Sequence, residues 1–124
     1  HVWIRHPMVG NADGSANIGN NLAEGVAIEL MEATTDELVA SVESTAKAAV
    51  EMLGDEGLGA LMAVHCGGRR GGIGDRMDET VTAMKNAIGE TPFIGVFTFG
   101  EYGFEGDLAN GCGGLMLSFM ALGK

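Results

Sequence analysis

An apolar run that ends in a glycine-rich, doubly basic segment constrains this chain most, since residues 60–75 read ALMAVHCGGRRGGIGD. Successive apolar positions are typical of a central strand that is covered on both faces. Cys66 stands at the end of the run, and the glycines after it allow the backbone to approach a ligand closely. Arg69 and Arg70 add positive charge. The stretch therefore predicts a strand followed by a binding loop.

Size and charge limit what the chain can be. Its 124 residues fit one domain, and 46% hydrophobic content with 2 prolines is typical of a folded protein. The net charge of −10 argues against binding nucleic acid or an anionic membrane. The 2 cysteines have no metal-ligand spacing and predict reduced thiols. We expect a cytoplasmic protein without a cofactor and, because the chain begins at His1, a C-terminal piece of a longer one.

The first half of the chain predicts strands and one well-marked helix. We expect an edge strand in residues 1–5, a short strand in residues 16–18 and a third strand in residues 26–31 (VAIELM), where apolar side chains recur at every second position. Thr34 and Glu37 have the spacing of a capping box, which predicts that a helix begins there. Gly54 is the expected stop of this helix.

The second half predicts another helix between strands. Asp75 is its expected N-cap, and Gly89 its expected end. Strands are predicted for residues 93–99 and 115–122, so the order of elements is β(β)βαβαββ. This order predicts an α/β (α+β) fold: a single mixed, largely antiparallel sheet of four to five strands, with two helices mainly on one face.

The helices in this arrangement leave one face of the sheet without a cover. Two helices cover only about one face, yet the last three predicted strands are apolar on both. We therefore expect the second face to be buried against another domain or a second copy of the chain.

Two interpretations of the glycine-rich segment stay open. It resembles loops that bind anions ahead of a helix N-terminus. The spacings of known phosphate loops are absent, because Ile73 stands where a P-loop has lysine and Met77 where a dinucleotide fingerprint has glycine. The segment is either an anion or carboxylate site, or a tight turn with solvated arginines.

Single residues around this segment also allow two interpretations each. Cys66 could be a nucleophile, or it could line a pocket or the core. His65 is a poor base for it, because adjacent side chains in a strand point to opposite faces. Glu101 lies between Gly100 and Gly103, where it would balance Arg69, take an amino group of a ligand, or be solvated.

Several segments of the chain resemble the FIST C-terminal domain (FIST_C). They are HCGGRRGGIGDR, ETPFIGVFTFGEYG and ANG, together with the upstream AEGVAIELME, and they extend over nearly the whole chain. The resemblance implies a single domain over residues 1–124 and a set of ligand-binding residues, namely Cys66, Gly67, Arg69, Gly100, Glu101 and Asn110.

The resemblance also implies a function. FIST C domains are regarded as non-catalytic sensory modules in signal transduction that bind small ligands, with amino acids as candidates. The implied partners are an N-terminal FIST-type domain of the same protein and a downstream signalling protein, and a homodimer is a further option. From the residues we infer that Arg69 would hold a carboxylate and Glu101 an ammonium group. The alternatives are an enzyme that uses Cys66, and a protein–protein interaction (adaptor) domain without a small-molecule site.

Overall fold

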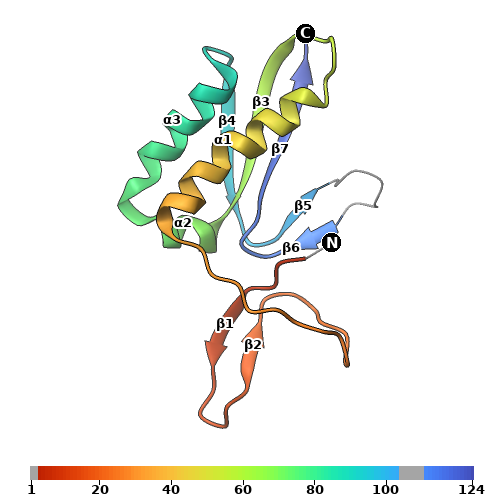
Figure 1. Ribbon diagram of the computed structural model, residues 1–124, viewed down its shortest axis with the longest axis vertical. Coiled ribbons are helices and arrows are strands. Elements are labelled where there is room, and N and C mark those ends of the chain that lie inside the picture. Colours follow the sequence, from red (N-terminus) through yellow and green to blue (C-terminus); the bar gives the residue numbers. More distant parts are fainter. Residues whose placement is uncertain (1–2, 104–110) are drawn as a thin grey trace.

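The computed structural model describes residues 3–103 and 111–124, and these form two longer helices, a short helix and seven strands (Figure 1). In chain order the elements are β1 (Pro7–Gly10), β2 (Ala16–Ile18), α1 (Thr35–Glu51), β3 (Leu58–Cys66), α2 (Gly67–Ile73), the 3₁₀ turn η1 (Gly74–Arg76), α3 (Met77–Ile88), β4 (Phe93–Thr98), β5 (Glu101–Gly103), β6 (Gly111–Gly113) and β7 (Leu117–Gly123). The α+β class predicted from the sequence is confirmed.

The largest sheet has the strand order β4-β3-β7, with β3 in the middle. β3 runs parallel to β4 and antiparallel to β7, so the sheet is mixed as predicted. Helices α1 and α3 lie side by side over one face of this sheet (Figure 1). The prediction that the helices pack mainly on one face is therefore confirmed.

The core lies between these two helices and the sheet. β3 contributes Leu61 and Ala63, which alternate with the less buried Met62 and Val64, because side chains of a strand point to opposite faces in turn. The helices add small and flexible apolar side chains that fit closely against the strands: Val42, Ala46, Ala83, Met84 and Ile88. The period of two places His65 on this same, helix-covered face.

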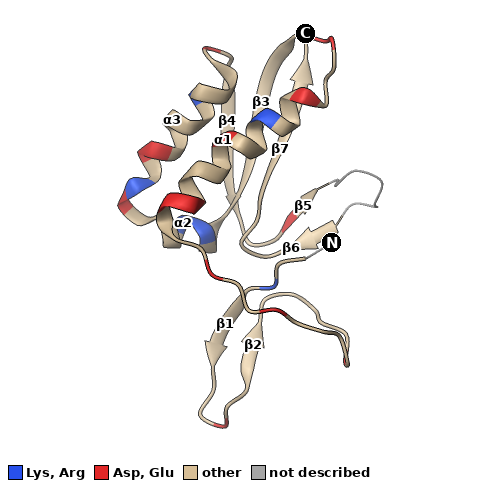
Figure 2. Ribbon diagram, in the orientation of Figure 1, with Lys and Arg blue, Asp and Glu red and all other residues tan. Residues whose placement is uncertain are grey.

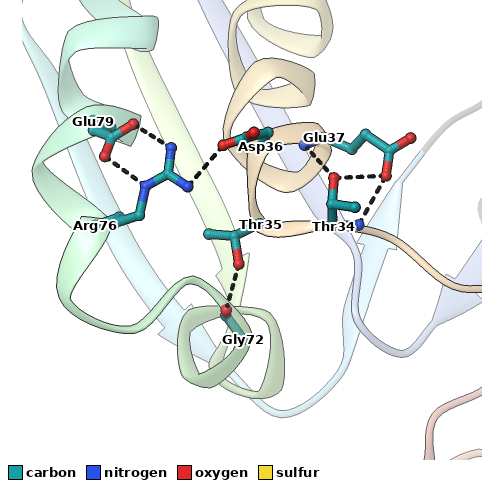
Figure 3. A network of polar contacts seen from close by, with 7 residues as sticks. All are labelled: Thr34, Thr35, Asp36, Glu37, Gly72, Arg76 and Glu79. Atoms are coloured by element: carbon teal, nitrogen blue, oxygen red, sulfur yellow. Dashed lines mark hydrogen bonds and ion pairs between the residues drawn. The ribbon is translucent and has the colours of Figure 1, made fainter.

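Local signals set the ends of both longer helices. Thr34 caps α1, since its hydroxyl accepts a hydrogen bond from the Glu37 amide at 3.2 Å and the Glu37 carboxylate accepts one from the Thr34 amide at 2.8 Å (Figure 3). This confirms the predicted capping box. α3 ends at Ile88, and Gly89 follows with a φ of 60°, a value that favours glycine.

The prediction of a single sheet of four to five strands is wrong. The described residues form three separate sheets, β1-β2, β4-β3-β7 and β5-β6. Residues 26–31 form no strand, because no neighbouring strand among the described residues pairs with them; Leu30 there is 94% exposed. The first strand also lies later than predicted, at Pro7–Gly10, where it pairs with the short strand Ala16–Ile18 that the sequence had indicated.

The glycine-rich segment is also not a loop. Residues 67–73 form α2, and η1 follows before α3 begins at Met77, so Asp75 lies within η1 and is not the N-cap of α3. Glycine is a poor helix former, and the sequence alone favours a loop. Packing reverses this preference, because Arg69 and Ile73 lie one helical turn apart and are both buried. The burial of these two side chains therefore explains why the segment is helical.

The second face of the main sheet remains apolar and exposed. Ile94 of β4 and Met120 and Leu122 of β7 lie on this face and are all exposed. Figure 2 shows no charged residue on β3, β4 or β7. The structure thus leaves open to solvent the face that the sequence predicts to be covered.

Candidate functional site

Cys66 ends β3 at a point where three segments meet. It pairs with Thr98 of β4, and its amide donates a hydrogen bond to the carbonyl of Met116 at 3.1 Å. The thiol is buried, and neither it nor Cys112 forms a disulfide. A buried thiol in this position acts as a small apolar group of the core.

Glu101 is fully buried beside this junction, and its carboxylate is held within the chain. One oxygen accepts hydrogen bonds from the Thr98 hydroxyl at 2.6 Å and from the Gly100 amide at 3.1 Å. The other accepts one from the Met116 amide at 3.3 Å. These bonds join the end of β4 to the segment before β7, and they satisfy a carboxylate that would otherwise be costly to bury.

Arg69 points toward α1 and away from this cluster of bonds. Its guanidinium donates hydrogen bonds to the carbonyl of Leu38 and the hydroxyl of Ser41. Burial lowers the pKa of Arg69, although an arginine of this kind stays charged at neutral pH. Its Nε has no partner among the residues that the structure describes. Arg69 therefore attaches α2 to α1.

The predicted site residues thus divide into two groups. Cys66, Gly67, Gly100 and Glu101 lie together at the carboxyl end of β3, where a Cβ on Gly67 would stand 3.3 Å from the Thr98 carbonyl oxygen. Arg69 and Glu101 have separate hydrogen-bond partners, so the structure does not show them facing a common ligand. Asn110 lies outside the described residues.

Arg70 and Arg76 are also engaged separately. Arg76 binds Asp36 at 2.7 Å and Glu79 at 2.6 Å, which links the first turns of α1 and α3 (Figure 3) and raises the pKa of Arg76. Arg70 lies over the ring of Phe97, 5.4 Å from its centre. The basic side chains therefore do not converge on one anion site.

A cavity of about 200 Å³ lies between α3 and the helix-covered face of the sheet. Its walls come from α1, α3 and the three strands of the main sheet, and they are formed by Val42, Ala63, His65, Met77, Thr80, Val81, Met84, Phe93, Gly95, Val96, Phe97 and Leu117. None of these residues is acidic, and histidine is the one basic type among them. The cavity is therefore suited to a neutral, largely apolar molecule.

His65 is the main polar group of this cavity, and it is only 6% exposed. Its Nδ1 lies 3.1 Å from the carbonyl oxygen of Cys66, and its ring packs edge-on against Phe97 with centres 5.6 Å apart. Since a carbonyl only accepts hydrogen bonds, Nδ1 must carry the proton. Nε2 has no partner within residues 3–103 and 111–124.

Thr80 is the second polar residue of the wall and is likewise buried. Its hydroxyl donates to the Met77 carbonyl at 2.6 Å, so its oxygen is left to accept. Sequence reasoning considered His65 only as a base for Cys66 and missed the cavity. The alternation of β3 was the available signal, because it places His65 on the face of Leu61 and Ala63.

Neither a metal site nor a membrane-spanning helix is found in the described part of the chain. No group of three or more His, Cys, Asp or Glu side chains there is arranged to hold a metal ion. Among those same residues, no helix has the length and apolar character needed to cross a membrane.

Comparison with known proteins gives one match. Residues 1–103 match the sequence profile of the FIST C domain. No curated protein and no solved structure shows a significant match to the chain. The profile covers most of the 124 residues, including Cys66, Arg69 and Glu101. The chain therefore belongs to the FIST C domain family, which suggests a sensory domain of signal transduction.

Proposed function

We propose that this chain is a non-catalytic sensory domain that binds a small ligand in the cavity beneath α3. The observation that carries the proposal is a histidine on the wall of a cavity of about 200 Å³, whose Nε2 is buried and has no partner in the described residues. Buried polar atoms are almost always paired, and an exception marks a place where another molecule can complete the bonding. Amino acids remain candidate ligands on the family resemblance alone.

The arrangement around Cys66 supports a role in binding over one in catalysis. The thiol is buried, and His65 on the next position uses Nδ1 for the Cys66 carbonyl while its ring packs on Phe97. A nucleophilic cysteine needs an accessible sulfur and a base within hydrogen-bond reach. Neither requirement is met by this pair.

The position of the cavity supports transmission of a binding signal. Its walls include both α1 and α3, and Arg69 attaches α2 to α1 through Leu38 and Ser41. A ligand that binds better at one distance between α3 and the sheet would increase the population of molecules with that distance. An N-terminal FIST-type domain, a downstream signalling protein or a second copy of the chain would receive the signal. The cytoplasmic location predicted from the sequence is part of this proposal.

The exposed apolar face of the main sheet favours a second function, that of an adaptor. Ile94, Met120 and Leu122 form an uncharged surface of the type that commonly contacts another protein. In that case the chain would bind a protein partner and would have no small-molecule ligand.

Thermal unfolding against a panel of small molecules separates the two functions. The panel contains amino acids, small carboxylates and neutral ring compounds. A ligand at ten times its Kd should add about 1.4 kcal/mol of stability, or about 5 °C in Tm. Val81 lies on the wall and on the exposed side of α3, so Val81→Phe should abolish the shift, while Thr82→Phe, at the next exposed position, should keep it. The absence of any shift across the panel would favour the adaptor.

A further inference from the structure

Resting on the proposed function, we propose that the cavity takes a small, uncharged, largely apolar molecule that donates a hydrogen bond to Nε2 of His65. Alcohols and phenols have this chemistry, whereas carboxylates do not. The assignment follows from three properties of the cavity: the direction of its hydrogen bonds, its lack of charge and its size.

The hydrogen-bond direction comes from the two polar side chains of the wall. Nδ1 of His65 donates to the Cys66 carbonyl, which leaves Nε2 of the neutral ring as an acceptor. The Thr80 hydroxyl gives its proton to the Met77 carbonyl and is also left as an acceptor. Both groups are buried in the free chain, so a ligand reaches Nε2 once the His65 ring turns toward the cavity, and it must then supply the hydrogen-bond donor.

The neutral state of His65 has a physical cause. Burial lowers its pKa, and the charge of Arg69 acts in the same direction, whereas the hydrogen bond to the Cys66 carbonyl and the charge of Glu101 raise it. Burial is the largest of these effects, so the ring is uncharged at neutral pH. An anionic ligand would find no positive charge on the wall, since none of the lining residues is Lys or Arg.

The size of the cavity suits a one-ring molecule. An engineered apolar cavity of about 150 Å³ in another protein stays dry and binds benzene, and the cavity here has about 200 Å³. Met77 and Met84 form part of the wall, and their unbranched side chains can adjust to a ring. Phenol therefore serves as the probe. Toluene has a similar shape but lacks the hydrogen-bond donor, and benzoate has a similar ring but carries a negative charge.

The test is an NMR titration of the full chain with ¹³C-labelled methionine methyl groups. Phenol should shift the methyl signals of Met77 and Met84 and leave those of the exposed Met8 and Met52, which are not part of the wall, unchanged. It should bind about tenfold more tightly than toluene, because one hydrogen bond to a buried acceptor has about this effect. Benzoate should cause no shift. Equal affinity of phenol and toluene, tighter binding of benzoate, or no shift with any probe would each overturn the inference.

A variant tests the anchor directly. His65→Phe keeps a ring of similar size but removes the acceptor, so phenol affinity should fall to that of toluene; His6→Phe, the same change outside the cavity wall, should leave it unchanged. The comparison of the three probes on the unaltered chain does not depend on either variant folding. A ligand from the thermal panel that stabilises the chain without moving the Met77 and Met84 signals would overturn this inference and leave the sensory function standing.

Discussion

The carboxylate of Glu101 accepts a 2.6 Å hydrogen bond from the hydroxyl of Thr98, three residues earlier in the chain. Further bonds from the amides of Gly100 and Met116 complete its surroundings. The sequence predicts Glu101 as a ligand for an ammonium group, but in the structure its buried carboxylate links the end of β4 to the segment before β7. Its hydrogen bonds thus connect two parts of the sheet that forms one side of the cavity.

Replacing this carboxylate should therefore reduce stability. Glu101→Gln places an amide donor where the wild-type oxygens face only donors, and we expect a loss of about 2–3 kcal/mol in the free energy of unfolding. Thr98→Val should cost less, about 1 kcal/mol, because it removes one of the three bonds. Urea unfolding measures both. Glu90→Gln, at an exposed position, is the control and should change the free energy of unfolding by less than about 0.5 kcal/mol. Equal losses for Glu101→Gln and Glu90→Gln would show that Glu101 does not hold the two segments together.

The adjacent arginines should behave differently when truncated. Arg69→Ala removes the bonds to Leu38 and Ser41 and leaves space beside α1, so we expect a loss of about 2–4 kcal/mol. Arg70→Ala removes only an exposed contact with the Phe97 ring and should cost about 0.5 kcal/mol. Chemical unfolding gives both values, and a larger loss for Arg70 would contradict the assigned contacts.

The lowered pKa of His65 should make stability depend on pH. Burial is its largest cause. The unfolded chain takes up a proton on this ring near pH 6.5, and the folded chain only at a lower pH. Between these two values the unfolded state binds more protons, so the free energy of unfolding should be constant above about pH 6.5 and fall as the pH is lowered toward the folded pKa. Urea unfolding from pH 5 to 8 should show this decline, and the decline should be smaller in His65→Phe. A decline that persists fully in His65→Phe would assign it to other groups.

The start of α1 offers a local prediction. Thr34→Ala removes the hydroxyl that accepts the Glu37 amide, and it should cost about 1 kcal/mol. Thr34→Ser keeps the hydroxyl and should restore most of the loss. Thermal unfolding of the two variants provides the measurement, and equal Tm values for both would mean that the cap contributes nothing.

Short-range sequence signals predicted the structure correctly at positions where it depends on residues close by in the chain. The capping box at Thr34 and Glu37 and the stop at Gly89 are of this kind, since each concerns residues within one helical turn. The central position of β3 followed from its uninterrupted apolar run. These features required no knowledge of what packs against them.

Features set by distant contacts could not be predicted in the same way. The glycines of α2 favour a loop, and only the burial of Arg69 and Ile73 explains the helix. Residues 26–31 have the alternation of a strand but lack a partner within the described residues. The donors to Glu101 include an amide fifteen residues away, and the cavity at His65 depends on the distance between α3 and the sheet.

The ¹⁵N signals of the His65 ring test the ligand site most directly. The proposed site requires a neutral ring at neutral pH with the proton on Nδ1 and an unprotonated Nε2. Saturating phenol should move the Nε2 signal as it accepts a hydrogen bond, while toluene should leave it in place. A proton found on Nε2 in the free chain, or an Nε2 signal that phenol does not move, would contradict the proposed role of His65.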